Sequence, residues 1–172
     1  MQETAIRVNR APVLTLWAAV VAGRLGLAPA TALSLASVVA GTAARAKARR
    51  LGLAEGRPKD EGQARPAREV ARLLGRDIPL VHGENGTVLA ERDGHPVPAG
   101  PVEAYLARAF GPRLDEVRAT MDELAGSIAP EELNRIGFRL YEAFRPDVPA
   151  DVSGWGAKGR LELARIRAAA DR

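Results

Sequence analysis

The amino-acid sequence predicts a mainly α-helical fold that contains a small β-meander, and three observations lead to this α+β class. Apolar residues recur at three- and four-residue spacing in residues 12–51, which is the spacing of an amphipathic helix. The same spacing returns after residue 101. Between these regions, Asn85-Gly86 and Asp93-Gly94 separate short apolar stretches, and such dipeptides favour hairpin turns. The chain has 172 residues, of which 47% are apolar, so it is long enough to bury a core.

Residues 1–53 are predicted to form an N-terminal helical pair. A proline near the start and a glycine just after the end mark a helix over 12–25 and a second helix over 29–51. Both helices carry an apolar face, so we expect them to pack as a short-loop hairpin that resembles a helix-turn-helix. The apolar positions are Val13, Leu16, Trp17, Val20 and Val21 in the first helix and Leu33, Leu35, Val38 and Val39 in the second.

The middle of the chain changes character twice. Residues 54–66 combine Gly, Pro and charged residues without periodicity, which predicts a basic, mobile linker. A short helix is expected over 67–74, ended by Gly75. The β-meander follows at 77–98, with strands expected at 78–82, 87–91 and 95–97.

The remainder of the C-terminal region, 67–172, is predicted to be helical. The expected helices are 102–110, 113–125, 130–145 and a last helix that follows Gly159 and carries Leu161, Leu163 and Ile166. Pro146 ends the third of these, because proline cannot continue a helix. This region forms either a unit of its own or one continuous domain with 1–53.

The composition excludes several classes of function. The chain has no cysteine, which excludes disulfides, thiolate nucleophiles and Cys-based zinc or iron–sulfur sites. Only two histidines are present, so a His-rich metal centre is excluded as well. We therefore expect neither a metal nor another cofactor.

The apolar N-terminal run does not favour a secreted or membrane protein. Residues 11–22 resemble the core of a signal peptide, but Glu3 lies in the region that should be basic, and Arg24 interrupts the apolar run. This run is also shorter than the roughly 20 residues that span a bilayer. We expect a cytoplasmic protein, with membrane contact through residues 11–44 as the alternative to a core hairpin.

Charge is distributed unevenly along the chain. The formal net charge is +4, yet residues 41–76 carry ten bases and four acids, whereas residues 77–156 carry seven bases and fourteen acids. Of the 25 basic residues 22 are arginine, whose guanidinium group suits phosphate binding, although the chain is also generally rich in Ala, Arg, Gly and Pro. This pattern is typical either of a protein that binds a polyanion with one part or of a fold in which the two parts neutralise each other.

Two features of the N-terminal pair suggest contact with nucleic acid. The tight turn between the helices is one that DNA-binding helix pairs share, but the second helix offers Ala30, Thr31, Ser34 and Ser37 where base recognition requires Arg, Asn, Gln or Lys. The basic C-terminal end of the second helix is the stronger candidate for contact with nucleic acid, since phosphate neutralisation needs no fixed geometry. Basic residues are also favourable at the C-terminal end of a helix, where the helix dipole is negative. A solvent-exposed helix end that binds no ligand therefore explains these residues equally well. The candidate phosphate-binding residues are Arg45, Lys47, Arg49 and Arg50.

A glycine-rich segment, residues 154–159, is a further candidate site. Its sequence Gly-Trp-Gly-Ala-Lys-Gly matches G-x-G-x-x-G, but a dinucleotide site also needs a preceding strand and an acid about 20 residues later. What remains is a glycine loop before a helix, in which Lys158 holds an anion and Trp155 stacks on a base. The simpler explanation is a loop packed on the body through Trp155.

The two histidines, His82 and His95, are the only candidates for acid–base chemistry or a weak metal site. They lie in the meander among acidic residues, and hairpin pairing is the means by which they would meet. Their spacing matches no ligand motif, and turns are ordinarily rich in acidic residues. We therefore expect a protein that is not an enzyme.

Three blocks of sequence carry a resemblance. Residues 10–17 (RAPVLTLW), 49–52 (RRLG) and 154–159 (GWGAKG) resemble those of an uncharacterised bacterial family of small, mostly helical proteins. The resemblance implies one folded unit of bacterial origin and no particular catalytic or binding residue.

The leading prediction is a non-enzymatic, nucleic-acid-associated protein that binds DNA through phosphate contacts. Arg45, Lys47, Arg49 and Arg50 would make these contacts, assisted by Lys158 and Trp155. The alternative is a protein-interaction or scaffolding module that forms a homodimer through its apolar N-terminal helices and meets a basic partner with its acidic surface.

Overall fold

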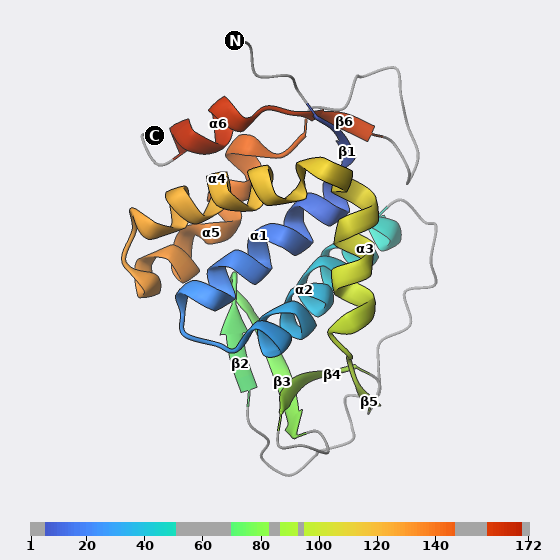
Figure 1. Cartoon of the computed structure of the whole chain (residues 1–172). Coiled ribbons are helices and arrows are strands. Elements are labelled where there is room, and N and C mark those ends of the chain that lie inside the picture. The colour runs from blue at the N-terminus through green and yellow to red at the C-terminus, as the bar shows by residue number, and fades with distance from the viewer. Residues whose placement is uncertain (1–5, 51–69, 83–86, 93–94, 147–157, 170–172) are drawn as a thin grey trace.

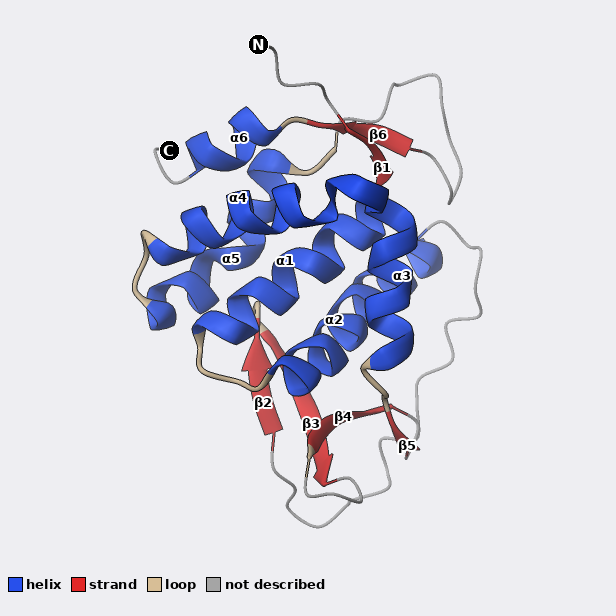
Figure 2. Cartoon of the chain, viewed as in Figure 1, coloured by secondary structure: helices blue, strands red, loops and turns tan. Residues whose placement is uncertain are grey.

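The structure, a computed structural model, describes residues 6–50, 70–82, 87–92, 95–146 and 158–169 (Figures 1 and 2). Its helices are α1 (Arg10–Arg24), α2 (Pro29–Arg50), α3 (Gly100–Phe110), the 3-10 turn η1 (Gly111–Arg113), α4 (Leu114–Gly126), α5 (Pro130–Phe144) and α6 (Leu163–Ala168). Its strands are β1 (Ile6–Asn9), β2 (Val70–Leu73), β3 (Arg76–His82), β4 (Val88–Arg92), β5 (His95–Pro96) and β6 (Lys158–Leu161). The predicted class, mainly α with a small β-meander, is confirmed.

Helix α1 is the centre of the fold, surrounded by α2, α3, α4 and α5 (Figure 1). Its Trp17 is fully buried, and the indole Nε1 donates a hydrogen bond to the carbonyl oxygen of Gly137 in α5 at 2.9 Å. The Trp17 ring meets Phe144 edge-on, with ring centroids 5.3 Å apart. A large ring buried with its N–H satisfied stabilises the packing of α1 on α5.

The predicted N-terminal helical pair is confirmed. Helices α1 and α2 pack along each other, and the turn between them contains Gly26 at φ 97°, a backbone conformation that favours glycine. The expected apolar positions Leu35 and Val39 of α2 are buried, as are all five of those expected in α1. The described parts of residues 1–53 and 67–172 share one hydrophobic core.

The meander is antiparallel in the order β2-β3-β4-β5, and the three strands expected from the sequence correspond to β3, β4 and β5. It packs on the N-terminal half of α2 through a buried serine. The hydroxyl of Ser34 donates to the Val97 carbonyl oxygen at 2.7 Å and accepts from the Ala90 N–H at 2.8 Å. The Val97 N–H also donates directly to the Ala90 oxygen, as in an antiparallel pair. The Ser34 hydroxyl therefore links the Ala90 N–H to the Val97 oxygen, in place of the second direct hydrogen bond of that pair.

The short helix expected over 67–74 is wrong. The chain instead forms β2, which pairs with β3 around the two-residue turn Leu74-Gly75, where φ is 53° and 82°. Two positive φ angles are what a tight hairpin turn requires, and Leu74 is held there from α5. Its N–H donates to Asn134 Oδ1, and Asn134 Nδ2 donates to the Arg72 oxygen, both at 2.8 Å.

The last helix also begins later than expected. Residues around Gly159 form strand β6, which pairs antiparallel with β1 and places Leu161 opposite Ile6. Helix α6 therefore starts at Leu163. The two-stranded sheet joins segments that are far apart in the sequence, and Figure 1 shows it near the top of the view, above the start of α4.

The remaining helices follow their predictions. Helices α3 and α5 each carry a proline in the first turn, and α4 follows the 3-10 turn η1. Helix α5 buries the apolar stripe expected for it, with Leu133, Leu140, Tyr141 and Phe144 inside and Ile136 half-buried. The predicted linker, residues 54–66, lies outside the described residues.

Candidate functional site

The four predicted basic residues all lie on α2, whose backbone continues as one helix to Arg50. Helical geometry places Arg45 and Arg49 on one side and Lys47 and Arg50 on another, because residues three or four apart share a face. The two sides are about 150° apart at 3.6 residues per turn. The side chains of these four residues lie outside the described part of the structure.

The helix-turn-helix-like surface of α2 is not available for base recognition. Thr31 and Ser34 are two of the four small residues that α2 offers in place of base-reading side chains, and both are buried under the meander. Thr31 Oγ1 donates to the Val88 carbonyl oxygen at 2.6 Å, and the hydroxyl of Ser34 is committed to the sheet. The N-terminal half of α2 therefore serves the fold, and packing alone explains the short-loop hairpin.

The glycine-rich segment does not provide the expected loop at a helix N-terminus. Lys158 and Gly159 belong to β6, opposite Asn9 and Val8, and the following helix begins four residues later. The anion-binding interpretation of this segment loses its geometric basis. Trp155 lies outside the described residues, as does the side chain of Lys158.

The two histidines are not brought together. His82 pairs with Val88 at one end of β4, whereas His95 pairs with Arg92 at the other end. Four residues along a strand separate these positions by about 13 Å. Among the described residues, no group of at least three His, Asp or Glu side chains is placed to hold a metal ion.

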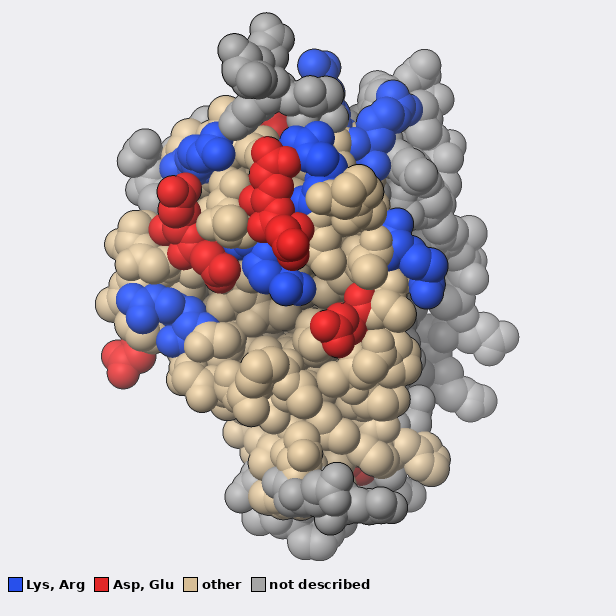
Figure 3. Space-filling view, in the orientation of Figure 1, with Lys and Arg blue, Asp and Glu red and all other residues tan. Residues whose placement is uncertain are grey.

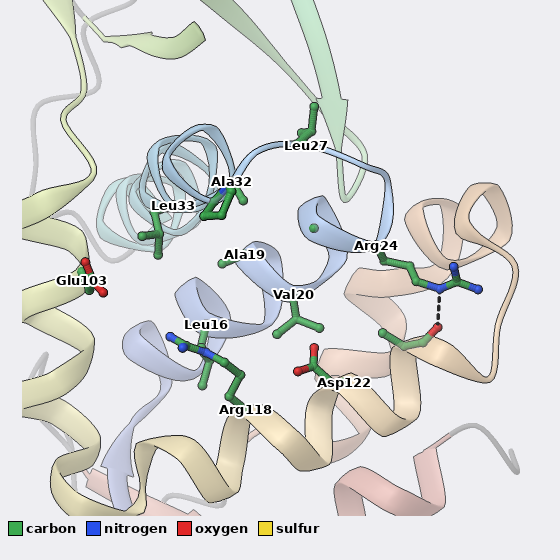
Figure 4. Close-up of a pocket in the computed structure, with 13 residues that line it drawn as sticks. Leu16, Ala19, Val20, Arg24, Leu27, Ala32, Leu33, Glu103, Arg118 and Asp122 are labelled. Carbon is green, nitrogen blue, oxygen red and sulfur yellow. Dashed lines mark hydrogen bonds between the residues drawn. The ribbon is translucent and has the colours of Figure 1, made fainter. Parts of the chain in front are cut away.

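The structure instead shows a cleft that no local motif predicted. It has a volume of about 440 Å³ and lies between the α1–α2 pair, α3 and α4 (Figure 4). Its floor is apolar, and charged residues from α3 and α4 stand at its rim. The lining residues are Leu16, Ala19, Val20, Gly23, Arg24, Leu27, Pro29, Ala32, Leu33, Glu103, Arg118, Asp122 and Ala125.

The charged residues of the cleft differ in what they contact. Arg24 caps α4, donating from Nε to the Ala125 oxygen at 3.2 Å and from Nη2 to the Ile128 oxygen at 3.1 Å. Glu103 stands on the α3 wall and Asp122 on the α4 wall (Figure 4). Burial raises the pKa of the Asp122 carboxyl, while the positive charge of Arg118 one helical turn away opposes that rise.

The cleft opens between two kinds of surface. Figure 3 shows Lys, Arg, Asp and Glu side chains intermixed over α4 and α3, and a broad area without charge below them, over the α1–α2 turn and the start of α2. Pockets of 300–1,000 Å³ with apolar walls and few polar groups are typical of small-molecule sites. No sequence pattern indicated this site, because its residues come from four helices.

Comparison with known proteins gives no match: no protein-family model, curated protein or solved structure corresponds to the chain. The resemblance to a bacterial family therefore stays a prediction. Within the described segments, no helix combines the length and apolar character needed to cross a bilayer.

Proposed function

We propose that the protein binds nucleic acid through the C-terminal half of α2, by neutralising phosphates rather than by recognising bases. The observation that carries this proposal is the continuous helix to Arg50 in a stretch without acids. Residues 4–54 contain no Asp or Glu, so no acid in the neighbouring helical turns neutralises the basic residues of α2. When such a cationic helix neutralises phosphates, the counterions condensed on the polyanion are released, which favours binding.

Duplex DNA is the form of nucleic acid that this arrangement favours. The major groove admits an α-helix and is bordered by two phosphate backbones. The pairs Arg45/Arg49 and Lys47/Arg50 lie on different sides of α2, so each pair would face one backbone. Contact with phosphates alone fixes position without specifying sequence, in keeping with the burial of Thr31 and Ser34.

Several arginines outside α2 make contacts within the protein itself, which leaves fewer of them to bind phosphates. Arg10, Arg24 and Arg165 each donate to a carbonyl oxygen at or near the end of a helix. Such contacts satisfy carbonyls that the helix itself leaves unpaired. Other arginines form ion pairs with carboxylates, namely Arg72, Arg113, Arg135, Arg160 and Arg167. The arginine content is therefore partly structural.

The alternative function, self-association through the N-terminal helices, is less well supported than phosphate binding. The apolar residues expected at a homodimer interface, including Leu16, Trp17 and Leu35, are buried within the chain itself. A homodimer stays a prediction, which sedimentation velocity tests directly.

The proposal is tested by fluorescence anisotropy of labelled duplex DNA at 50 to 200 mM salt. The test variant carries Arg45→Gln, Arg49→Gln and Arg50→Gln. The dependence of log K on log salt should become shallower by about 0.9 for each phosphate that the variant no longer neutralises, or roughly 3 in total. Replacing the same three residues with Lys keeps the charge and should preserve most of the binding.

A matched control removes three charges elsewhere. Arg76, Arg108 and Arg139 are exposed, and changing each to Gln alters the net charge by the same amount. Loss of binding in the α2 variant but not in this control supports the proposal. Equal losses in both would show a general charge effect, and an absence of binding at 50 mM salt would refute the proposal.

A further inference from the structure

We propose that the cleft between α1, α2, α3 and α4 binds an uncharged, largely apolar small molecule, whose body lies against the floor formed by α1 and α2. The proposal does not rest on nucleic-acid binding, because it concerns other residues and a ligand of a different class. The apolar floor, the balance of charge at the rim and the position of one glycine each favour this class of ligand.

The floor of the cleft provides an apolar surface from both N-terminal helices. Leu16, Val20 and Ala32 are buried in the core, while Ala19 and Leu33 are only half-buried beside them. Figure 4 shows these side chains between α3 on one side and α4 on the other. An alkyl or aryl group placed there removes apolar area from water on both surfaces, which favours binding. A cavity of about 150 Å³ holds benzene, so a cleft of about 440 Å³ has room for a larger apolar body.

The charges at the rim are balanced, so they favour neither a cation nor an anion. Arg24 and Arg118 carry two positive charges, and Glu103 and Asp122 carry two negative ones. The hydrogen bonds from Arg24 to carbonyl oxygens hold its side chain at the end of α4 and leave its charge in place. An ion in the cleft would lose part of its hydration and would add a charge that the balanced rim does not neutralise. Neither penalty applies to an uncharged molecule.

The environment of Asp122 agrees with an uncharged ligand. Partial burial raises the pKa of its carboxyl group, which favours the neutral form, and the positive charge of Arg118 only opposes that rise. The wall formed by α4 therefore already disfavours a charged group at this position.

The position of Gly23 indicates that the opening is not a packing defect. Glycine is a poorer helix former than every residue except proline. A Cβ at Gly23 would meet no atom within 4 Å, and its φ is not positive, so neither packing nor backbone geometry requires glycine there. The residue lines the cleft, and any larger side chain would reduce the space.

The first test compares three probes of one chain length by isothermal titration calorimetry at pH 7: n-octanol, n-octylamine and octanoate. Octanol should bind most tightly to the unmodified protein, and the two ions should each bind about tenfold more weakly or worse, because their charge is less well hydrated in the cleft. Binding of either ion as tightly as octanol would overturn the proposal, as would an absence of octanol binding.

The second test varies the length of the apolar body. In the series n-octanol, n-heptanol and n-hexanol, each methylene removed should weaken binding about fourfold, which corresponds to the transfer of one buried methylene from water. An affinity that does not depend on chain length would show that the apolar floor is not the binding surface. Both tests use the unmodified protein, so they do not depend on the stability of a variant.

A blocking variant separates the cleft from other surfaces. Gly23→Leu should abolish octanol binding without lowering Tm, because leucine favours helix and the added side chain meets open space. Ala119→Leu adds a leucine side chain at an exposed position of α4 that does not line the cleft, and it should leave binding intact. Unchanged octanol binding to the Gly23→Leu variant, or an equal loss in both variants, would place the ligand elsewhere and overturn the proposal.

Discussion

Replacing Ser34 with alanine is expected to destabilise the protein strongly, although it removes a single oxygen atom. The hydroxyl is fully buried and makes two hydrogen bonds, to the Val97 oxygen at 2.7 Å and from the Ala90 N–H at 2.8 Å. Each bond contributes about 0.5–1.5 kcal/mol, and a buried group left without a partner costs about 1–3 kcal/mol. The two strands can close part of the gap, so we expect a total loss of about 2–4 kcal/mol.

The measurement is urea unfolding of the Ser34→Ala variant, with thermal unfolding beside it. For a chain of this size the expected loss corresponds to a fall in Tm of about 5–15 °C. Ser127→Ala is the matched control, because that hydroxyl donates to the Leu124 oxygen at an exposed helix end and its loss should cost at most about 0.5 kcal/mol. Equal effects of the two substitutions would refute the assignment of Ser34 as the bridge between α2 and the meander.

Three further predictions concern α5. Gly137→Ala should lower the free energy of unfolding by about 1–3 kcal/mol, because the new methyl group would collide with Leu74, and an unchanged urea midpoint would contradict this. Asn134→Ala should destabilise the β2–β3 turn by about 1–3 kcal/mol in the same assay, whereas Asn134→Asp keeps the acceptor for Leu74 and should lose about half as much. Burial raises the pKa of Tyr141 to about 12, so stability should be complete below pH 10 and fall as the pH rises toward 12. Tyrosinate absorbance, compared with Tyr141→Phe, should show that ionisation, and a transition near 10 would contradict it.

The elements that the sequence predicted are those with local signals. The α1–α2 pair follows from apolar spacing and from glycine at the turn, and β3–β4 follows from Asn85-Gly86. Strand β2 was mistaken for a helix because four residues are too few to show a period, and its turn has Leu74 where an Asn or Asp is usual. The strands β1 and β6 pair across about 150 residues, and nothing near either strand identifies the other.

The candidate sites also differ in whether a local sequence signal identifies them. The basic residues of α2 could be named from the sequence because they are neighbours on one helix. The cleft could not, since Gly23 and Asp122 approach only when α4 packs on α1. The burial of Ser34 was also beyond local reasoning: a small hydroxyl residue suits both a solvent-exposed helix and a buried bridge, and only the position of β4 distinguishes them.

Helix α2 therefore divides into a half that holds the meander and a half that is charged, and the two should be separable by mutation. The variant with Gln at positions 45, 49 and 50 should change the free energy of unfolding by at most about 1 kcal/mol, because Gln and Arg have similar helix propensities and the lost dipole interaction is small. Ser34→Ala should have the opposite profile, with lower stability and unchanged DNA affinity at temperatures where it is folded. If the Gln variant instead lost several kcal/mol in urea unfolding, the arginines would be structural contacts of the body. Phosphate binding by this half of α2 would then be untenable, because the same guanidinium groups cannot serve both partners.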